Sequence, residues 1–147
     1  MATKQNDIRD AMISTIADIA NIHKVGTYPD NVAKIGHNFP SVMVGDGDEI
    51  WESSSGDREI VAYNIPMYVY HNVKNRRTSA MNTITNEVIK AILADLTQDG
   101  NCINTEIESV EKGDYSETED YYNPGFYPNL TIRRINITIT YFDNRSC

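Results

Sequence analysis

The sequence lacks the features that mark several large classes of protein. Its 147 residues include two cysteines, Cys102 and Cys147, too few and too far apart for a disulfide scaffold or a CxxC redox or zinc motif. No apolar run approaches the ~18 residues that suggest a membrane span, and the polar residues 1–6 do not resemble a signal peptide. We therefore expect two free thiols, no membrane partner, and a protein made in the cytoplasm of its host cell.

Basic residues are also scarce. The chain has 13 Lys and Arg against 21 Asp and Glu, a formal net charge of -8, and the acids gather in residues 46–59 and 106–120. Phosphate contacts need concentrated positive charge, so this composition argues against a dedicated nucleic-acid binder. The surface would on balance repel DNA.

Motifs for catalysis and metal binding are missing as well. The sequence contains no nucleophile motif, phosphate-binding glycine loop or metalloprotease signature, and its three histidines are scattered. Residues 45–49 superficially suggest calcium, but they lack the register of an EF-hand loop. Glu106 and Glu108 could project from one strand face as an acid–base pair, yet no second feature supports catalysis. We expect neither an enzyme nor a bound metal or cofactor.

The longest strand pattern, residues 59–70, organises the predicted fold. Its apolar face carries Val61, Tyr63, Ile65, Met67 and Val69. The other face carries Tyr68 and Tyr70. Pro66 lacks the N–H that a ladder needs, which predicts an edge or a bulge. Because the pattern is longer than the usual strand of about five or six residues, we expect part of it to serve another subunit.

Two helices flank this strand in the sequence. The first starts near Asn6, repeats isoleucine and methionine at helical spacing, and is expected to end near residues 24–26. The second starts at Thr78 or Ser79, extends its apolar face to Leu96, and is followed by the stop residue Gly100. Residues 27–39 have no clean period and predict an irregular connection.

Shorter patterns predict the remaining strands. Residues 40–44 form one strand, and Asp46 with Gly47 predicts a hairpin turn before a returning strand at Ile50. Residues 102–110 form a weaker strand, and residues 130–141 a long one. The alternation of the long strand slips at Arg133 and Arg134, where a bulge would restore it.

The predicted order is α-β-β-β-α-β-β in a single domain. This order indicates an α+β fold with two layers, in which two helices cover one face of a mixed, mostly antiparallel sheet. Residues 112–129 form a long acidic and aromatic loop insertion, and loops longer than ~12 residues are usually functional or disordered. The uncovered sheet face is amphipathic, which suits subunit contact or the lining of an aqueous channel.

The helix over residues 8–22, the strand 40–44, the strand 60–70 with the helix 79–96 behind it, and the last strand 130–141 together resemble a known family. Their order is similar to that of the tail terminator (tail completion) proteins of long-tailed bacteriophages. The resemblance implies a structural virion protein at the tail–head junction that forms a hexameric ring on the tail tube. The implied partners are further copies, the tail tube protein and the head-completion or neck proteins, while genome DNA passes through the lumen without specific binding.

Three segments and two tyrosines are the expected contact sites. The predicted interface residues are Asp46, Asp48, Tyr68, Tyr70, Lys74, Arg76, Arg77, Tyr121, Tyr122 and Phe126. A ring closes only if two different patches meet, and an acidic ring lets DNA slide without sticking.

Two alternatives remain open at this point. The first is a head–tail adaptor or head-closure protein, which also acts in virion assembly. The second is a small acidic cytosolic binding module, similar to an immunity protein, whose acids would bind a basic enzyme.

Overall fold

The computed structural model describes residues 4–19, 22–28, 40–53, 59–72, 77–98, 100, 102–114 and 130–143 of the chain. These residues form two helices and six strands. In chain order the elements are α1 (Lys4–Ala17), β1 (Lys24–Thr27), β2 (Ser41–Val44), β3 (Glu49–Ser53), β4 (Glu59–Asn72), α2 (Arg77–Leu93), β5 (Asn104–Asp114) and β6 (Leu130–Asp143). The predicted α+β class is confirmed, with one strand, β1, beyond the predicted order.

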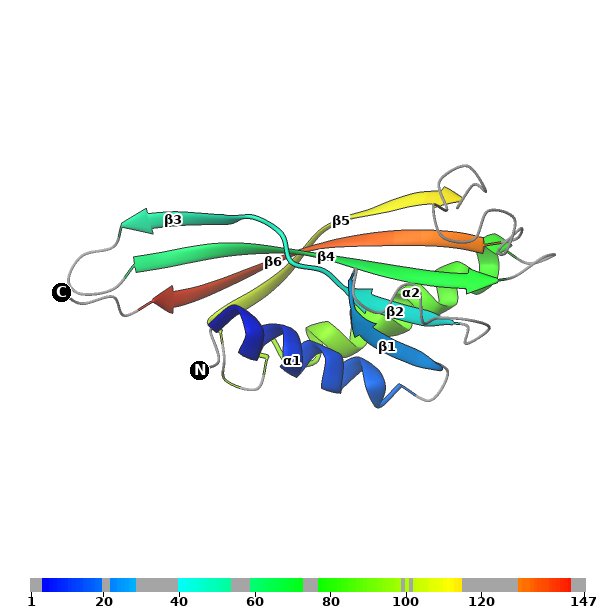
Figure 1. Cartoon of the computed structure of the whole chain (residues 1–147), viewed down its shortest axis with the longest axis horizontal. Helices are drawn as coiled ribbons and strands as arrows, with labels where there is room; N and C mark the ends of the chain where they lie inside the picture. The colour runs from blue at the N-terminus through cyan, green and yellow to red at the C-terminus, as the bar shows by residue number, and fades with distance from the viewer. Residues whose placement is uncertain are drawn as a thin grey trace.

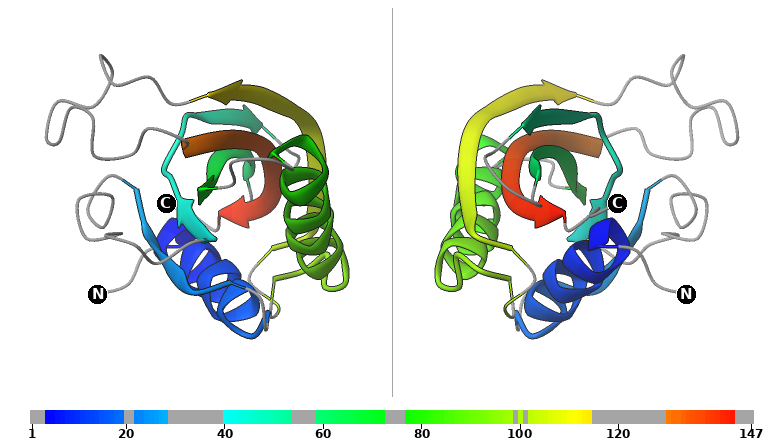
Figure 2. Two further views of the ribbon diagram at one scale, coloured as in Figure 1. Left: turned by 90° about the vertical axis from the view of Figure 1, so that its right-hand side faces the viewer. Right: turned by 90° about the vertical axis from the view of Figure 1, so that its left-hand side faces the viewer.

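The strands form one mixed, mostly antiparallel sheet. Its order is β1-β2-β4-β6-β5, and β3 pairs with β4 on the same edge as β2. The β1–β2 pair is parallel, and the other described pairs are antiparallel. Both helices lie on one side of the sheet (Figure 1) and share a single apolar core with it. In the end-on views of Figure 2, α1 runs under β1 and β2 while α2 runs beside β5.

Each helix buries one stripe of apolar side chains. In α1 the stripe is Ile8, Met12 and Ile16, spaced four residues apart and fully buried. In α2 the buried stripe is Met81, Ile84, Val88 and Ile92. Full burial of each such side chain contributes about 1.5–3 kcal/mol, so these stripes fix both helices to the sheet.

The centre of the sheet is the β4–β6 ladder. It runs without interruption from Glu59 opposite Asp143 to Asn72 opposite Leu130. The predicted core face of β4 is confirmed, because all five of its apolar residues from Val61 to Val69 are fully buried. The start of β4, the end of β6 and β3 project beyond both helices (Figure 1), and we call this three-stranded extension the arm.

The first helix ends earlier than predicted. It stops at Ala17, and tight turns follow in which the Ile19 N–H donates to the Ile16 carbonyl at 3.0 Å and the Ile22 N–H to the Ile19 carbonyl at 3.2 Å. The next residues pair with β2 as β1, for which β-branched Val25 and Thr27 are suited. The predicted irregular connection lies, beyond Tyr28, outside the described residues.

The predicted hairpin at Asp46 and Gly47 is wrong. Strands β2 and β3 run in the same direction along one edge of β4, with Val44 opposite Met67 and Glu49 opposite Tyr63. Four residues, 45–48, therefore face three residues, 64–66, and the segment is a bulge in one long edge strand. Because β3 pairs with β4, Trp51 packs against the core. A reversal of the chain at Asp46 and Gly47 would not keep Trp51 in this position.

The predicted bulge at Arg133 and Arg134 is also wrong. The β4–β6 register passes through both residues unbroken. The irregularity lies in β5, between Ile107 and Ser109. Arg133 therefore occupies a core-facing position and is 5% exposed.

The ends of one helix and one strand also differ from the prediction. Helix α2 ends at Leu93, so Leu96 lies beyond the helix, and Gly100 follows in the connection with a φ of 77°. Strand β5 continues to Asp114, so residues 112–114 of the predicted insertion pair with β6. The rest of the predicted insertion lies outside the described residues. No helix in the described part of the chain is long and apolar enough to cross a membrane.

Candidate functional site on the open face of the sheet

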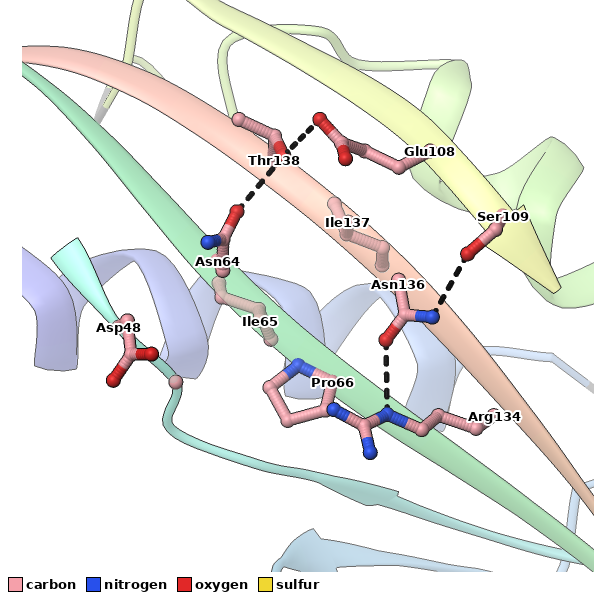
Figure 3. Close-up of a pocket in the computed structure, with 11 residues that line it drawn as sticks. Asp48, Asn64, Ile65, Pro66, Glu108, Ser109, Arg134, Asn136, Ile137 and Thr138 are labelled. Carbon is pink, nitrogen blue, oxygen red and sulfur yellow. Dashed lines mark hydrogen bonds between the residues drawn. The ribbon is translucent and has the colours of Figure 1, made fainter. Parts of the chain in front are cut away.

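The sheet face opposite the helices carries a polar groove of about 330 Å³ (Figure 3). Its floor is formed by the outward residues of β4 and β6, which include Asn64, Asn136 and Thr138. One wall is the bulge at Gly47 and Asp48, and the other is the β5 irregularity at residues 108–109. Two departures from regular pairing therefore shape the site.

Close backbone contact holds the bulge wall against β4. The Gly45 N–H donates to the Pro66 carbonyl at 2.7 Å, and the Asn64 N–H donates to the Asp48 carbonyl at 2.8 Å. The missing N–H of Pro66 thus faces the bulge, which confirms the bulge alternative predicted for this proline. A Cβ atom on Gly47 would lie 2.4 Å from the Asn64 carbonyl oxygen, so only glycine allows this approach.

Side chains from the core side secure the same wall. The Tyr63 hydroxyl donates to the Asp46 carboxylate, and the Arg9 guanidinium donates to the Val44 carbonyl at 3.2 Å. Burial, followed by the hydrogen bond to Asp46, raises the pKa of Tyr63 well above its ordinary value, so the phenol stays protonated. The bulge is thereby tied both to helix α1 and to the core face of β4.

One hydrogen-bond chain crosses the groove floor at Thr138. Its hydroxyl donates to Glu108 Oε1 at 2.7 Å and lies 3.0 Å from Asn64 Oδ1 (Figure 3). The single hydroxyl proton serves one acceptor at a time, and a charged carboxylate is the stronger acceptor. Glu108 reaches Thr138 from the irregular part of β5. Glu106, two residues earlier on the same strand, pairs with Thr138.

A second chain centres on Asn136. Its amide donates to Ser109 Oγ and to Glu111 Oε2, both at 2.8 Å, and its oxygen accepts from Arg134 Nε at 2.9 Å. Arg134 also lies 3.6 Å from Glu111, in an ion pair whose side chains are 47% and 62% exposed. These bonds orient the amide and guanidinium groups along the groove.

An aromatic group adjoins the groove beyond Arg134. The Arg134 guanidinium lies 5.7 Å from the centre of the Tyr68 ring, and the Tyr28 ring centre lies 4.4 Å from that of Tyr68. Burial raises the pKa of Tyr68. The Tyr70 ring centre is 6.4 Å away on the same strand. The open face thus changes from polar to aromatic along β4.

Several charged and polar side chains of the groove are bonded to one another. The groove carboxylate Glu108 is hydrogen-bonded to a hydroxyl, and Glu111 is bonded to an amide and paired with a guanidinium. Among the described residues that line the groove, the hydroxyls belong to Ser109 and Thr138, and none is a histidine, cysteine or lysine. Within the described ranges, no group of three or more His, Cys, Asp or Glu side chains could hold a metal ion. The fixed donors and acceptors of the groove can bond to polar groups of a macromolecular surface.

The structure brings together only part of the predicted interface. Asp46 and Asp48 lie on the bulge, and Tyr68 lies on the open face, half-buried. Tyr70 is 4% exposed, so the expectation that position 70 is offered outward is wrong. Arg77 begins α2. The remaining predicted residues, Lys74, Arg76, Tyr121, Tyr122 and Phe126, lie outside the described residues.

Sequence reasoning assigned three residues of the groove, Glu108, Ser109 and Arg134, to no contact site, and considered Glu108 only as half of an acid–base pair with Glu106. The first two reach it because β5 is irregular at residue 108, which the weak alternation of that strand does not reveal. Arg134 could have been found, because it shares the even-numbered face of Asn136 and Thr138 in an unbroken strand.

Comparison with known proteins identifies no family for this chain. No protein-family model matches the chain, and a search of the curated proteins finds no match.

Proposed function

We propose that the protein is a structural virion protein of a long-tailed bacteriophage, a tail terminator that caps the tail tube. Copies of the chain form a ring at the tail–head junction, stop growth of the tube and offer a surface to the head-completion or neck proteins. The observation that carries this proposal is the one-sided layering of the fold. Both helices cover one sheet face, and within the described part of the chain no helix covers the other face or the arm.

The chemistry of the open face supports contact with protein rather than DNA. The groove carries amides, hydroxyls and carboxylates with one guanidinium, which is already paired with Glu111. The whole chain has a net charge of -8. Phosphate would be repelled at such a surface, so DNA passes the ring without binding.

A capping assay tests the proposal. The chain is mixed with the polymerising tail tube protein of its own phage, and tube lengths are measured by negative-stain electron microscopy. We expect shorter tubes that carry a ring at one end. Unchanged tube lengths and bare ends at excess chain would refute the function.

A matched pair of variants tests the open face in the same assay. Thr138→Arg places a bulky charge on the groove floor, whereas Asn86→Arg places the same charge on the exposed side of α2. We expect Thr138→Arg to lose capping by at least about tenfold in effective concentration and Asn86→Arg to retain it. Equal capping by both variants would remove the groove from the proposed contact.

A binding module of another class is the second candidate. Asp48, Glu106 and Glu108 are all exposed along the open face, which would also suit a basic enzyme as partner. Under that function the chain would not shorten tubes at any concentration.

A further inference from the structure

Arg133 is the charged residue that the described structure buries most deeply, at 5% exposure. Its Nη1 donates to the carbonyl of the preceding residue, Ile132, at 3.3 Å, while Nε is buried without a hydrogen-bond partner. The structure gives Arg133 no ion pair with any described carboxylate. A buried guanidinium that lacks a counter-charge is costly, so an anion beside it would remove much of that cost.

His71 lies beside Arg133 on the helix side of the sheet. Val69 pairs with Arg133 and His71 pairs with Thr131, so His71 is a diagonal neighbour of Arg133, with Cα atoms roughly 7–8 Å apart. The Arg133 side chain bends back toward the Ile132 carbonyl, and therefore toward the row of His71. The Nδ1 atom of His71 is also buried without a hydrogen-bond partner in the described structure. Two basic side chains thus adjoin each other with unused nitrogen atoms.

A second histidine adds charge at the same end of the sheet. The His23 N–H donates to the Pro40 carbonyl at 2.9 Å, and β2 then starts opposite Tyr70, the neighbour of His71 on β4. Burial, followed by the charge of nearby His23, lowers the pKa of His71. His71 is partly exposed and His23 is exposed, so this group of basic residues borders the surface, from which a small ion can reach it.

Helix α2 directs its positive end to the same place. Strand β4 ends at Asn72 and α2 begins at Arg77, so the first turn of the helix lies near the end of β4 and the start of β6 (Figure 1). That turn contains no acidic residue. The first N–H groups of a helix lack partners within the helix and carry the positive end of its dipole, which attracts anions. Positive charge therefore converges here from a helix as well as from two strands.

The arrangement suits a tetrahedral oxyanion. The basic groups belong to β4, β6 and α2 and approach from different directions, whereas the two oxygens of a carboxylate accept within one plane. Arginine side chains and helix N-termini are also the groups that commonly bind phosphate. The ligand must be small, because a nucleic-acid duplex is too bulky to reach a side chain that is 5% exposed.

We propose that this basic end of the sheet, defined by Arg133, His71, His23 and the first turn of α2, binds a phosphate group, either free or at the end of a small molecule. The phosphate accepts hydrogen bonds from the Arg133 guanidinium and the His71 ring. It supplies the counter-charge that Arg133 lacks among the described residues, and it ties β4, β6 and α2 together. The site lies on the helix side of the sheet, opposite the groove, and does not depend on the tail function.

A matched pair of arginine variants tests this site. Arg133→Met and Arg134→Met remove the same charge at adjacent positions of β6, one buried on the helix side and the other exposed on the open face. Binding of inorganic phosphate to the full chain is measured by isothermal titration calorimetry in a chloride buffer of constant ionic strength. Circular dichroism checks that each variant is folded.

We expect the wild type to bind one phosphate saturably. Arg133→Met should weaken this binding at least about tenfold, because the charged hydrogen bonds of the guanidinium are lost, whereas Arg134→Met should change it less than about twofold. Urea titrations with and without phosphate give a second readout. Phosphate stabilises folded proteins in general by exclusion from their surface, so the specific effect is the stabilisation that Arg134→Met keeps and Arg133→Met loses.

Two further variants decide the matter if Arg133→Met does not fold. Arg133→Lys keeps the charge but loses the planar fork, and His71→Phe keeps a ring but loses both ring nitrogens. Each should weaken phosphate binding at least about threefold. Glycerol 3-phosphate is titrated in parallel. Tighter binding of the free ion than of the ester identifies inorganic phosphate as the ligand, and the reverse identifies a small phosphorylated molecule.

Other results overturn the site. These are a wild type without saturable phosphate binding, an Arg133→Met protein that binds phosphate like the wild type, and acetate that binds as tightly as phosphate. Competition by a short DNA duplex would also overturn it, because the bound group would then lie on the surface. The tail function is judged separately in the tube-capping assay, where the outcome does not depend on phosphate.

Discussion

Tyr63 donates its phenolic hydrogen bond to the carboxylate of Asp46 across the bulge between β2 and β3. The Tyr63 ring is fully buried on the core face of β4, whereas Asp46 is exposed on the bulge. One side chain thus joins the hydrophobic core to the segment that forms a wall of the groove. The stability of the fold and the shape of the open face are coupled at this pair.

Removal of the phenolic hydroxyl should therefore cost stability. We expect Tyr63→Phe to lower the free energy of unfolding by about 1–2 kcal/mol, because the ring still fills its site but the bulge loses its bond. Urea titration followed by fluorescence measures this. Tyr68→Phe is the control, since Tyr68 lies half-buried on the open face, and it should change stability by less than about 0.5 kcal/mol. Equal losses in both variants would mean that the Asp46 bond contributes nothing.

Alkaline pH should destabilise the protein through the same residue. Burial and the Asp46 hydrogen bond raise the native pKa of Tyr63 above its ordinary value of 10.0, so the folded chain keeps a proton that the unfolded chain releases. The stabilising contribution is complete below pH 10 and is lost as pH rises above it. Unfolding titrations between pH 8 and 11 should show a steeper loss for the wild type than for Tyr63→Phe. A Tyr28→Phe control should follow the wild type, and identical slopes in all three proteins would contradict the prediction.

Gly47 should tolerate no side chain. The Cβ of Gly47→Ala would stand 2.4 Å from the Asn64 carbonyl oxygen, a backbone atom that cannot rotate away. We expect a loss of at least about 2 kcal/mol in unfolding free energy, even though alanine restricts the unfolded chain and gains about 0.4–1 kcal/mol from that. Asp48→Ala is the control, because only its backbone carbonyl takes part in the bulge pairing, and it should stay near the wild type. A Gly47→Ala protein as stable as the control would show that the bulge can move off β4.

Strong periodicity explains which parts of the fold can be predicted from sequence. The core face of β4 follows from strict alternation over a long run, and the stripes of α1 and α2 follow from spacing by three and four residues. Strand β1 escapes prediction because four residues carry too little pattern, and its pairing with β2 depends on chain segments far apart in sequence.

The errors near the site have a different origin. Asp46 and Gly47 fit a two-residue turn as well as a bulge, and the choice depends on whether β3 finds its partner in β2 or in β4. The groove then follows from two irregularities. Pro66 marks the one at residues 45–48, whereas no local pattern marks the one at residue 108. Tyr68 could be placed from its parity alone, whereas Tyr70, with the same parity, is buried by its tertiary surroundings.

Arg133 shows why the polarity of a side chain does not predict its burial in β6. A pair of arginines in a strand predicts a bulge that would keep both side chains out of the core. The β4–β6 register is nevertheless unbroken, and Arg133 lies opposite Val69 on the core face. Its Nη1 donates to the Ile132 carbonyl at 3.3 Å, while Nε is buried without a hydrogen-bond partner in the described structure. Burial of a charged group with incomplete bonding is costly, so apolar packing can replace it without loss.

We therefore expect Arg133→Met to keep or raise the free energy of unfolding, by up to about 2 kcal/mol, because methionine fills a similar length of core without the desolvation cost. Arg134→Met is the matched control. Its ion pair with Glu111 is exposed, so its loss should stay within about 0.5 kcal/mol. Paired urea titrations decide the matter. A loss of more than about 2 kcal/mol for Arg133→Met alone would mean that the guanidinium contributes to stability despite its incomplete bonding, and that β6 retains it for the fold.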